Sequence, residues 1–346
     1  MQLGKLNIKN SFISGPMAAL SNFPLREVIA GFGGVALQYT EMLDCKRLLK
    51  EDFNNNPYIL KNTLGVPTIH QIFTSDSVIA VKAVSKLMDY GVDGIDVNMA
   101  CPAPNIKKQQ SGIMLMNDEE LASRIVAEIR RIYNGTLTVK IRIGFEDDIG
   151  KTIGFCKKLE KEGADAIVFH PRLFNQKLKA LSKWKYITDL KNNIKIPVIG
   201  NGDVKNAKDA LERQKEYNID WIMISRLSAV RPWIFREIEC LEKNETFILT
   251  KDELSDMWEK YFELSAKYFD EHKGFERIVK WVEYFSKNFM FGHQFWVNIK
   301  NAKTVSKAKE IGMNFIGNNS LCSLILFSIL SRCVYKSFFI YTLSQQ

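Results

Sequence analysis

Residues 91–102 read GVDGIDVNMACP, and this stretch decides the fold. A glycine-containing turn leads into alternating apolar residues at Ile95, Val97 and Met99, which is typical of a β-strand. The strand then gives way abruptly to polar residues, a thiol at Cys101 and a proline. This is how a catalytic residue is presented at the mouth of a barrel. A lone cysteine is more often a buried structural residue, so the rest of the chain has to decide between the two roles.

The region around this strand repeats the same pattern. Short apolar, β-branched segments alternate with longer amphipathic ones up to about residue 241, which predicts βα units and a parallel sheet. Helices are predicted between the strands, for example over 118–132 with Asn117 as its N-cap. The predicted strands are 12–15, 35–39, 68–73, 94–98, 138–143, 166–170, 197–200 and 221–225. Eight βα units over about 240 residues predict a TIM (β/α)8 barrel. An open doubly wound sheet is less favoured, because no Gly-rich dinucleotide motif follows the first strand.

The pattern changes after about residue 245, where helices continue without strands. We predict helices over 252–269, 275–289 and 296–311, and aromatic residues at helical spacing favour a bundle core over a stacking surface. We expect a barrel domain over residues 1–243 and a helical domain over 244–315. Residues 316–346 form an apolar C-terminal tail, in which segment 321–330 is too short to span a bilayer.

The composition is that of an ordinary globular protein, with 46% hydrophobic residues in 346, which is enough for a sizeable core. Six scattered cysteines form no C-x-x-C pair and the N-terminus has no apolar signal segment, so we expect a reducing, cytoplasmic setting. Four dispersed histidines predict no metal site.

The net charge of +9 favours a polyanionic partner only slightly, because many basic proteins never bind nucleic acid. Position is more informative. Lysines cluster after the Cys101 loop, at Lys107 and Lys108, and after the strand that ends at His170, at Lys177, Lys179, Lys183 and Lys185. Most such clusters are solvated loop faces.

Two neighbouring strand ends predict a phosphate site. Gly200-Asn201-Gly202-Asp203 follows the seventh strand, and Ser225-Arg226 follows the eighth. Glycines let backbone N–H groups approach an anion, and an arginine adds a forked cationic donor. Tight turns alone explain the glycines but not the arginine, and these two loops form the usual phosphate site of TIM barrels.

Three further strand-end residues suit a flavin mononucleotide (FMN). Gln71 can donate to and accept from the pyrimidine edge of the ring, and Lys140 can stabilise the negative charge of a reduced flavin. His170 lies at another strand end. Each alone is explained as a satisfied polar residue, so their convergence on one face is what points to FMN.

With these motifs in order over about residues 10–240, the chain resembles the tRNA-dihydrouridine synthase family. Ala19, Ala100 and Ser225 stand where that family commonly has glycine. The matching segments are Gly15-Pro16-Met17-Ala18, Thr40-Glu41-Met42, Gln71-Ile72-Phe73, Asp96-Val97-Asn98-Met99-Ala100-Cys101-Pro102, Val139-Lys140-Ile141-Arg142-Ile143-Gly144, Phe169-His170-Pro171-Arg172, Ile199-Gly200-Asn201-Gly202-Asp203 and Arg231-Pro232-Trp233-Ile234-Phe235.

The resemblance implies an FMN-dependent oxidoreductase that takes electrons from NADPH or NADH and reduces the C5=C6 bond of particular uridines in tRNA. It implies tRNA as partner, and we expect a monomer without membrane attachment. Residues expected to bind FMN are Pro16, Met17, Gln71, Lys140, His170, Asn201, Gly202, Asp203, Ser225 and Arg226. Those expected near the substrate or its phosphates are Asn98, Arg142, Arg172, Lys107 and Lys108.

In this reading Cys101 is the proton donor. Hydride from the reduced flavin FMNH2 reaches C6 of the uracil, and an acid on the opposite face must deliver a proton to C5. A thiol with a near-normal pKa of about 8.5 is mostly protonated at neutral pH and can be that acid. The uridine must leave its stack, so we expect RNA to be bound by its shape and backbone.

Two alternatives share parts of this pattern. One is an FMN-dependent barrel reductase of a free pyrimidine or a small enone, which needs neither the helical domain nor the basic loops. The other is a non-catalytic RNA-binding relative that keeps the barrel. Salt-dependent tRNA binding separates the first alternative from a tRNA enzyme, and the flavin absorbance of the purified protein separates the second.

Overall fold

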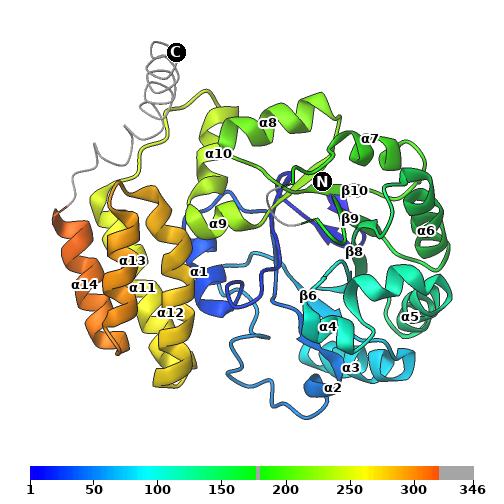
Figure 1. The fold of residues 1–346 in the computed structure, drawn as a ribbon, viewed down its shortest axis with the longest axis horizontal. Helices are drawn as coiled ribbons and strands as arrows, with labels where there is room; N and C mark the ends of the chain where they lie inside the picture. The colour runs from blue at the N-terminus through cyan, green and yellow to red at the C-terminus, as the bar shows by residue number, and fades with distance from the viewer. Residues whose placement is uncertain (177–179, 319–346) are drawn as a thin grey trace, which may run out of the picture. The chain divides into compact units, whose positions relative to one another are not determined.

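The structure, a computed structural model, describes residues 1–176 and 180–318. Within these residues, parallel strands form a closed barrel in which the last strand pairs with the first (Figure 1). This confirms the predicted TIM barrel. A short extra strand, β5 (Leu43–Asp44), extends the pairing of β6. The eight barrel strands are β3 (Phe12–Ser14), β4 (Leu37–Tyr39), β6 (Thr68–Phe73), β7 (Gly94–Met99), β8 (Thr136–Gly144), β9 (Ala166–Leu173), β10 (Val198–Asn201) and β11 (Trp221–Ile224).

Two strands are longer than predicted. Strand β8 runs to Gly144, and β9 continues through Pro171 to Leu173, because their pairing resumes between Gly144 and Leu173 after an irregularity. His170 and Arg172 therefore lie two residues apart on one strand, where side chains point to the same face. The prediction ended this strand at residue 170, which placed His170 at the strand end and Arg172 in a loop. The strand in fact ends three residues later, at Leu173.

Helices surround the strands, as Figure 1 shows for α3, α5, α6, α7 and α8. Helix α5 begins one residue later than predicted, because Asp118 rather than Asn117 is its N-cap and accepts a hydrogen bond from the Leu121 N–H. The helices of this unit are α1 (Phe23–Gly31), α2 (Cys45–Leu48), α3 (Ser77–Tyr90), α4 (Pro104–Lys108), α5 (Glu119–Ile132), α6 (Ile149–Lys161), α7 (Lys185–Lys191), α8 (Ala207–Glu216), α9 (Arg226–Val230) and α10 (Ile234–Glu242), with a 3-10 helix at Gly112–Asn117.

A small N-terminal hairpin closes one end of the barrel core. Strands β1 (Gln2–Leu3) and β2 (Leu6–Asn7) pair antiparallel, and the carbonyl of Leu3 accepts a hydrogen bond of 3.2 Å from Thr136 at the start of β8. Leu3 and Ile8 are buried in the same cluster as Ile13 and Val168 from the barrel strands. Since the hairpin lies at the N-terminal end of β8, the opposite end remains for a site.

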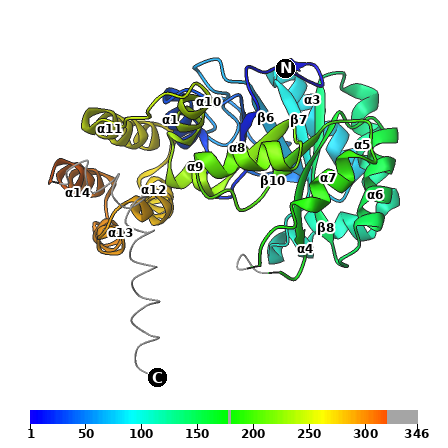
Figure 2. The same ribbon diagram turned by 90° about the horizontal axis from the view of Figure 1, so that it is seen from above.

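The chain divides into two compact units, residues 1–228 with 232–245, and 229–231 with the residues from 246 on. The described part of the second unit contains α11 (Lys251–Tyr268), α12 (Glu271–Phe285), a 3-10 helix (Ser286–Asn288), α13 (Gly292–Asn301) and α14 (Val305–Asn318), which form the bundle seen in Figure 2. The single helix predicted over 296–311 is wrong, because the chain breaks between α13 and α14 and Lys303 adopts a positive φ of 63°.

Aromatic residues form the core of this bundle, as predicted. Trp258, Trp281 and Phe285 are fully buried, and the ring of Trp258 lies against that of Trp281 with centroids 5.6 Å apart. Gly312 on α14 is required there, since a Cβ would lie 1.9 Å from the Trp258 ring. Within the described ranges, no helix combines the length and apolar character needed to cross a membrane. Most of the predicted apolar tail, from residue 319 on, lies outside the described residues.

Candidate active site

A hydrogen-bonded network crosses the barrel interior. Asp96 on β7 is fully buried and pairs in register with Gln71 on β6 and with Thr138 on β8. Its carboxylate accepts 2.7 Å from Gln71 Nε2 and 2.6 Å from Thr138 Oγ1. Thr138 in turn lies 3.2 Å from the hydroxyl of Tyr39 on β4, a strand that does not neighbour β8. These side chains therefore point into the barrel.

Asn98 connects this network to the Cys101 loop. Its Nδ2 donates to Gln71 Oε1 at 2.8 Å, and its Oδ1 accepts from the backbone N–H groups of Ala100 and Cys101 at 3.1 and 3.0 Å. The loop is also held from its far side, where the Cys101 carbonyl accepts from the Ile113 N–H at 3.2 Å. Cys101 thus lies in a loop whose backbone is fixed by a residue expected near the substrate.

The environment keeps Cys101 protonated. Burial raises the pKa of its thiol above the ordinary value, although the positive charges of Arg142 and Lys140 act in the opposite direction. The near-normal pKa expected from the sequence therefore becomes an elevated one. Lys107 and Lys108 follow the Cys101 loop in the sequence. Both lie on α4, and Lys107 Nζ is 5.0 Å from the ring centroid of Phe174.

Lys140 and Arg142 alternate along β8 and bring two cations to the same interior. Burial lowers the pKa of Lys140, and the neighbouring Arg142 lowers it further, while Asp96 opposes this shift. In Asp96 burial raises the pKa, and the hydrogen bonds from Thr138 and Gln71 oppose that shift. Burial lowers the pKa of Arg142 to about 10, and its Nη1 donates to the Leu173 carbonyl at 3.3 Å. The predicted cofactor and substrate cations are therefore neighbours.

His170 is a neutral imidazole in this surrounding. Burial lowers its pKa well below the usual value, and the charges of Lys140, Arg142, Arg172 and Arg226 lower it further. Its Nε2 is buried without a hydrogen-bond partner among the described residues. A Cβ at Gly202 would lie 2.7 Å from the ring, and Gly202 has a positive φ of 126°, so only glycine fits beside it.

Asp203 holds two arginines, Arg226 of the predicted phosphate site and Arg172, which was predicted near the substrate. Its Oδ2 accepts from Arg172 at 2.6 Å and from both the N–H and the hydroxyl of Ser182, at 2.8 and 2.9 Å, and its Oδ1 accepts from Arg226 at 2.8 Å. Burial alone raises the pKa of Asp203, but the Ser182 hydrogen bonds and the Arg172 charge outweigh it and lower the pKa. Asp203 is thus placed to orient cations, whereas the sequence offered it as a direct cofactor contact.

The remaining predicted cofactor residues lie around the β3 and β11 ends. The Gly15 N–H donates to the Ile224 carbonyl at 3.0 Å, and a Cβ at Gly15 would clash with the Ser225 hydroxyl. Asn201 Nδ2 donates to the Met223 carbonyl at 2.8 Å and lies 3.3 Å from Ser225 Oγ. Pro16 and Met17, both partly exposed, follow Gly15 directly.

Sequence reasoning missed Asp96 and Thr138, which organise the interior. The signal was available, because Asp96 precedes Asn98 by two residues and Thr138 precedes Lys140 by two, so each shares a strand face with a predicted site residue. A polar residue repeated at this spacing in a buried strand indicates a polar barrel interior.

The donor set fits an anionic, polar cofactor such as FMN. Arg172 is fully buried, and its Nε and Nη1 have no hydrogen-bond partner in the described part of the chain, like His170 Nε2. Buried polar atoms are normally satisfied, so the Arg172 donors favour a bound acceptor and His170 Nε2 favours a further polar group beside it. Arg226, Arg142 and Lys140 add positive charge, and Gln71 retains both donor and acceptor capacity.

Comparison with known proteins identifies the family of this chain. The family model described as Dihydrouridine synthase (Dus) matches residues 12–317. A tRNA-dihydrouridine synthase B of Proteus vulgaris is 30% identical over 69% of this chain and 74% of its own length. A probable tRNA-dihydrouridine synthase of Mycobacterium tuberculosis is 28% identical over 84% of this chain and 78% of its own length.

Solved structures add the fold alone. A complex of 2-naphthoyl-CoA reductase has a TM-score of 0.53 at 12% identity, covering 71% of this chain and 52% of its own. A histamine dehydrogenase from Rhizobium sp. 4-9 has a TM-score of 0.54 at 11% identity, covering 76% and 50%. The chain spans about half the length of these structures. The family model covers nearly the whole described chain, barrel and bundle together, and the chain therefore belongs to the dihydrouridine synthase family.

Proposed function

We propose that this protein is a tRNA-dihydrouridine synthase, an oxidoreductase that binds FMN, takes electrons from NADPH or NADH, and reduces the C5=C6 bond of specific uridines in tRNA. The observation that carries the proposal is a thiol, Cys101, in a loop that the Asn98 amide holds at the end of barrel strand β7, in a chain that belongs to the dihydrouridine synthase family.

FMN would be held by the predicted residues around the C-terminal strand ends. Arg226 supplies a cation for the phosphate, while Gln71 and Lys140 supply a fixed amide and a charge for the ring. When bound and reduced, FMN supplies a hydride for C6 of the uracil. The remaining contributors are Pro16, Met17, His170, Asn201, Gly202 and Ser225, with Asp203 orienting Arg226.

The chain's own residues would supply the proton. Cys101 Sγ holds a proton because burial raises its pKa, and it would deliver this proton to C5 as a general acid. Negative charge develops on the uracil O4 as C6 accepts hydride, and the positive charges of Lys140 and Arg142 favour that charge in a buried site. Asn98 fixes the backbone of the donor and would lie beside the base, with Arg172 nearby.

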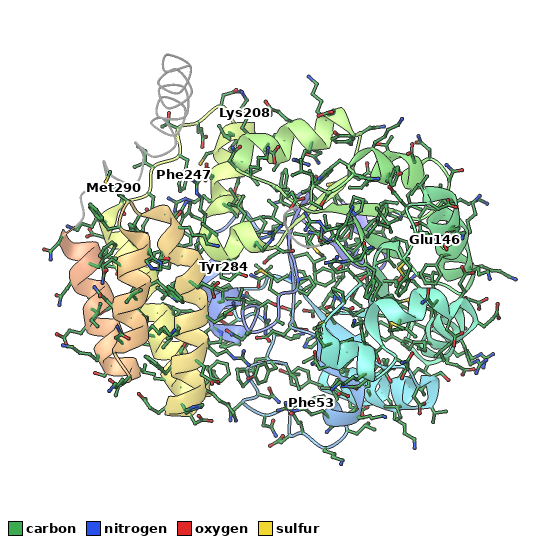
Figure 3. All side chains as sticks on the ribbon, in the orientation of Figure 1. Phe53, Glu146, Lys208, Phe247, Tyr284 and Met290 are labelled. Carbon is green, nitrogen blue, oxygen red and sulfur yellow. The ribbon has the colours of Figure 1, made fainter. Side chains whose placement is uncertain are left out.

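In this proposal the barrel domain, residues 1–243, binds FMN. The helical domain, residues 244–315, binds the tRNA. Figure 3 labels Tyr284, a half-buried residue of α12. Lys280 Nζ, which also donates to Glu283 at 2.8 Å, and Lys287 Nζ lie 5.4 and 4.6 Å from the centroid of its ring. Ammonium groups held beside an aromatic ring suit a sugar–phosphate backbone. Lys107 and Lys108 on α4 would add phosphate contacts near the reacting base.

The decisive experiment maps dihydrouridine in tRNA from cells that contain the protein, lack it, or carry Cys101→Ala. We expect particular dihydrouridines to disappear in the second and third strains, and the purified protein to show flavin absorbance. Unchanged dihydrouridine in the deletion strain would overturn the proposal. Binding of tRNA that fails even at low salt would favour a reductase of small pyrimidines or enones.

A further inference from the structure

A continuous chain of hydrogen bonds joins the barrel interior to the proton-donor loop. It runs from the Asp96 carboxylate to the Gln71 amide, from Gln71 to the Asn98 amide, and from Asn98 to the backbone N–H groups of Ala100 and Cys101. Asp96 and Gln71 are fully buried and Asn98 is nearly so. Every link is between 2.7 and 3.1 Å long.

The polarity of this chain is fixed at both ends. The two backbone N–H groups can only donate, so Asn98 must turn its oxygen to them and its Nδ2 to Gln71. Gln71 must then accept through Oε1 and donate through Nε2. At the other end an amide N–H can only donate, so the Asp96 oxygen that meets Nε2 accepts from it, and the second Asp96 oxygen accepts from Thr138. Each amide therefore has a single orientation that satisfies all of its neighbours.

This orientation determines what Gln71 offers a ligand. One N–H and one lone pair of its amide remain unused by the network. A rotated Gln71 amide would exchange donor and acceptor positions, and would place like groups against both Asp96 and Asn98. The pattern of donor and acceptor shown to the cofactor thus depends on a residue that does not itself need to touch it.

We propose that Asp96 is a positioning residue whose carboxylate fixes the orientation of the Gln71 amide toward the flavin. Through the hydrogen bond from Asn98 to Gln71, it also fixes the backbone of the Cys101 loop. This deepens the proposed function, because it couples the cofactor-facing residue to the proton donor. Thr138 supports it by donating to the second carboxylate oxygen at 2.6 Å.

Two substitutions separate orientation from charge. Asp96→Leu removes both acceptors. Asp96→Asn removes the charge but keeps an oxygen for Gln71, since the new N–H can donate to Thr138, whose hydroxyl can donate onward to Tyr39. We expect the FMN dissociation constant, measured by flavin fluorescence, to rise about tenfold or more in Asp96→Leu and to stay within about threefold of wild type in Asp96→Asn.

The two other outcomes overturn the proposal. Equal loss of FMN affinity in both variants would mean that Asp96 acts only through its charge, as a counter-ion to Lys140. Retained affinity in both would mean that it only fills the barrel interior. Neither result depends on tRNA or on turnover, so a failure here is distinguishable from a failure of the proposed function.

A second measurement tests the coupling without FMN and without changing Asp96. In the apoprotein, Gln71→Leu leaves Asn98 Nδ2 without its acceptor while Asp96 keeps Thr138. We expect the iodoacetamide alkylation rate of Cys101, quantified by mass spectrometry of its peptide, to change about threefold or more. Alkylation of Cys240 in the same sample is the internal control. A Cys101 rate equal to that of wild type would overturn the coupling, and this readout serves even if Asp96→Leu does not fold.

Discussion

Arg226 Nη2 donates to Oδ1 of Asp203 at 2.8 Å, while the other oxygen of that carboxylate is occupied by Arg172 and Ser182. One carboxylate therefore orients two arginines, one on strand β9 and one at the start of helix α9. The arginine proposed to bind the FMN phosphate is thus held by an acidic residue, Asp203, which the sequence predicted as a cofactor contact and which the structure pairs with arginines.

Removing Asp203 tests this arrangement. Asp203→Ala leaves Arg172 buried without its counter-charge, so we expect the free energy of unfolding to fall by about 3 kcal/mol, together with weaker FMN binding. Denaturant unfolding of the apoprotein measures the first effect. Asp147→Ala is the matched control, since it also removes an ion pair, with Lys183, but an exposed one worth about 1 kcal/mol or less. Equal losses in the two variants would contradict the buried role of Asp203.

Cys101→Ala tests the proton donor. We expect the variant to keep bound FMN and tRNA affinity but to lose about 100-fold or more in turnover, the scale of a general acid. Single-turnover oxidation of the reduced flavin by tRNA measures this loss. Cys240→Ala, which removes another partly exposed thiol, is expected to react at the wild-type rate. A normal rate in Cys101→Ala removes this residue from the mechanism.

The elevated pKa of Cys101 makes a separate prediction. The thiolate is the form that alkylates, and burial disfavours it, so the rate of Cys101 alkylation is expected to rise with pH at a midpoint above the reference value of about 8.5. Arg142→Gln removes a charge that favours the thiolate, so its midpoint is expected to be higher still. A midpoint below that of a free cysteine would show that the cations outweigh burial.

His70 predicts a pH dependence of stability. It is fully buried, its Nε2 lies 2.6 Å from the Ile59 carbonyl, and burial lowers its pKa from 6.5 to about 4. Between these values the unfolded chain binds a proton that the folded chain does not, so stability falls as pH decreases from about 6.5 to 4, by about 3 kcal/mol.

The measurement is denaturant unfolding of the apoprotein across this pH range. His70→Gln keeps a side-chain N–H for Ile59 but does not titrate, so its stability is expected to fall less between pH 7 and 4 than that of wild type. Parallel curves for the two proteins would mean that His70 does not contribute. His170 titrates in both proteins and cancels in the comparison.

The barrel could be predicted from the sequence because its buried strands are apolar runs bounded by turn residues, as in residues 94–98 before Cys101. It did not reveal the break between α13 and α14, since residues 302–304 contain neither glycine nor proline. The two-residue strands β1 and β2 are too short for a periodic signal. In the site, the positions of Gln71, Lys140 and His170 along their strands predicted that they lie near one another. The sequence could not predict which groups donate and which accept hydrogen bonds in the interior, because this depends on how residues of neighbouring strands pair.

The pairing of β3 with β11 joins Ile13 to Met223, at opposite ends of the barrel sequence. Loop closure over such a distance is entropically unfavourable and slow, and the proposed cofactor residues lie on both sides of this seam. A ligand that binds only the closed barrel would therefore stabilise the pairing of β3 with β11. If FMN is that ligand, cells starved of riboflavin are expected to contain less of this protein, because barrels that have opened are degraded by proteases. The amount of protein would then fall in addition to the activity of each molecule.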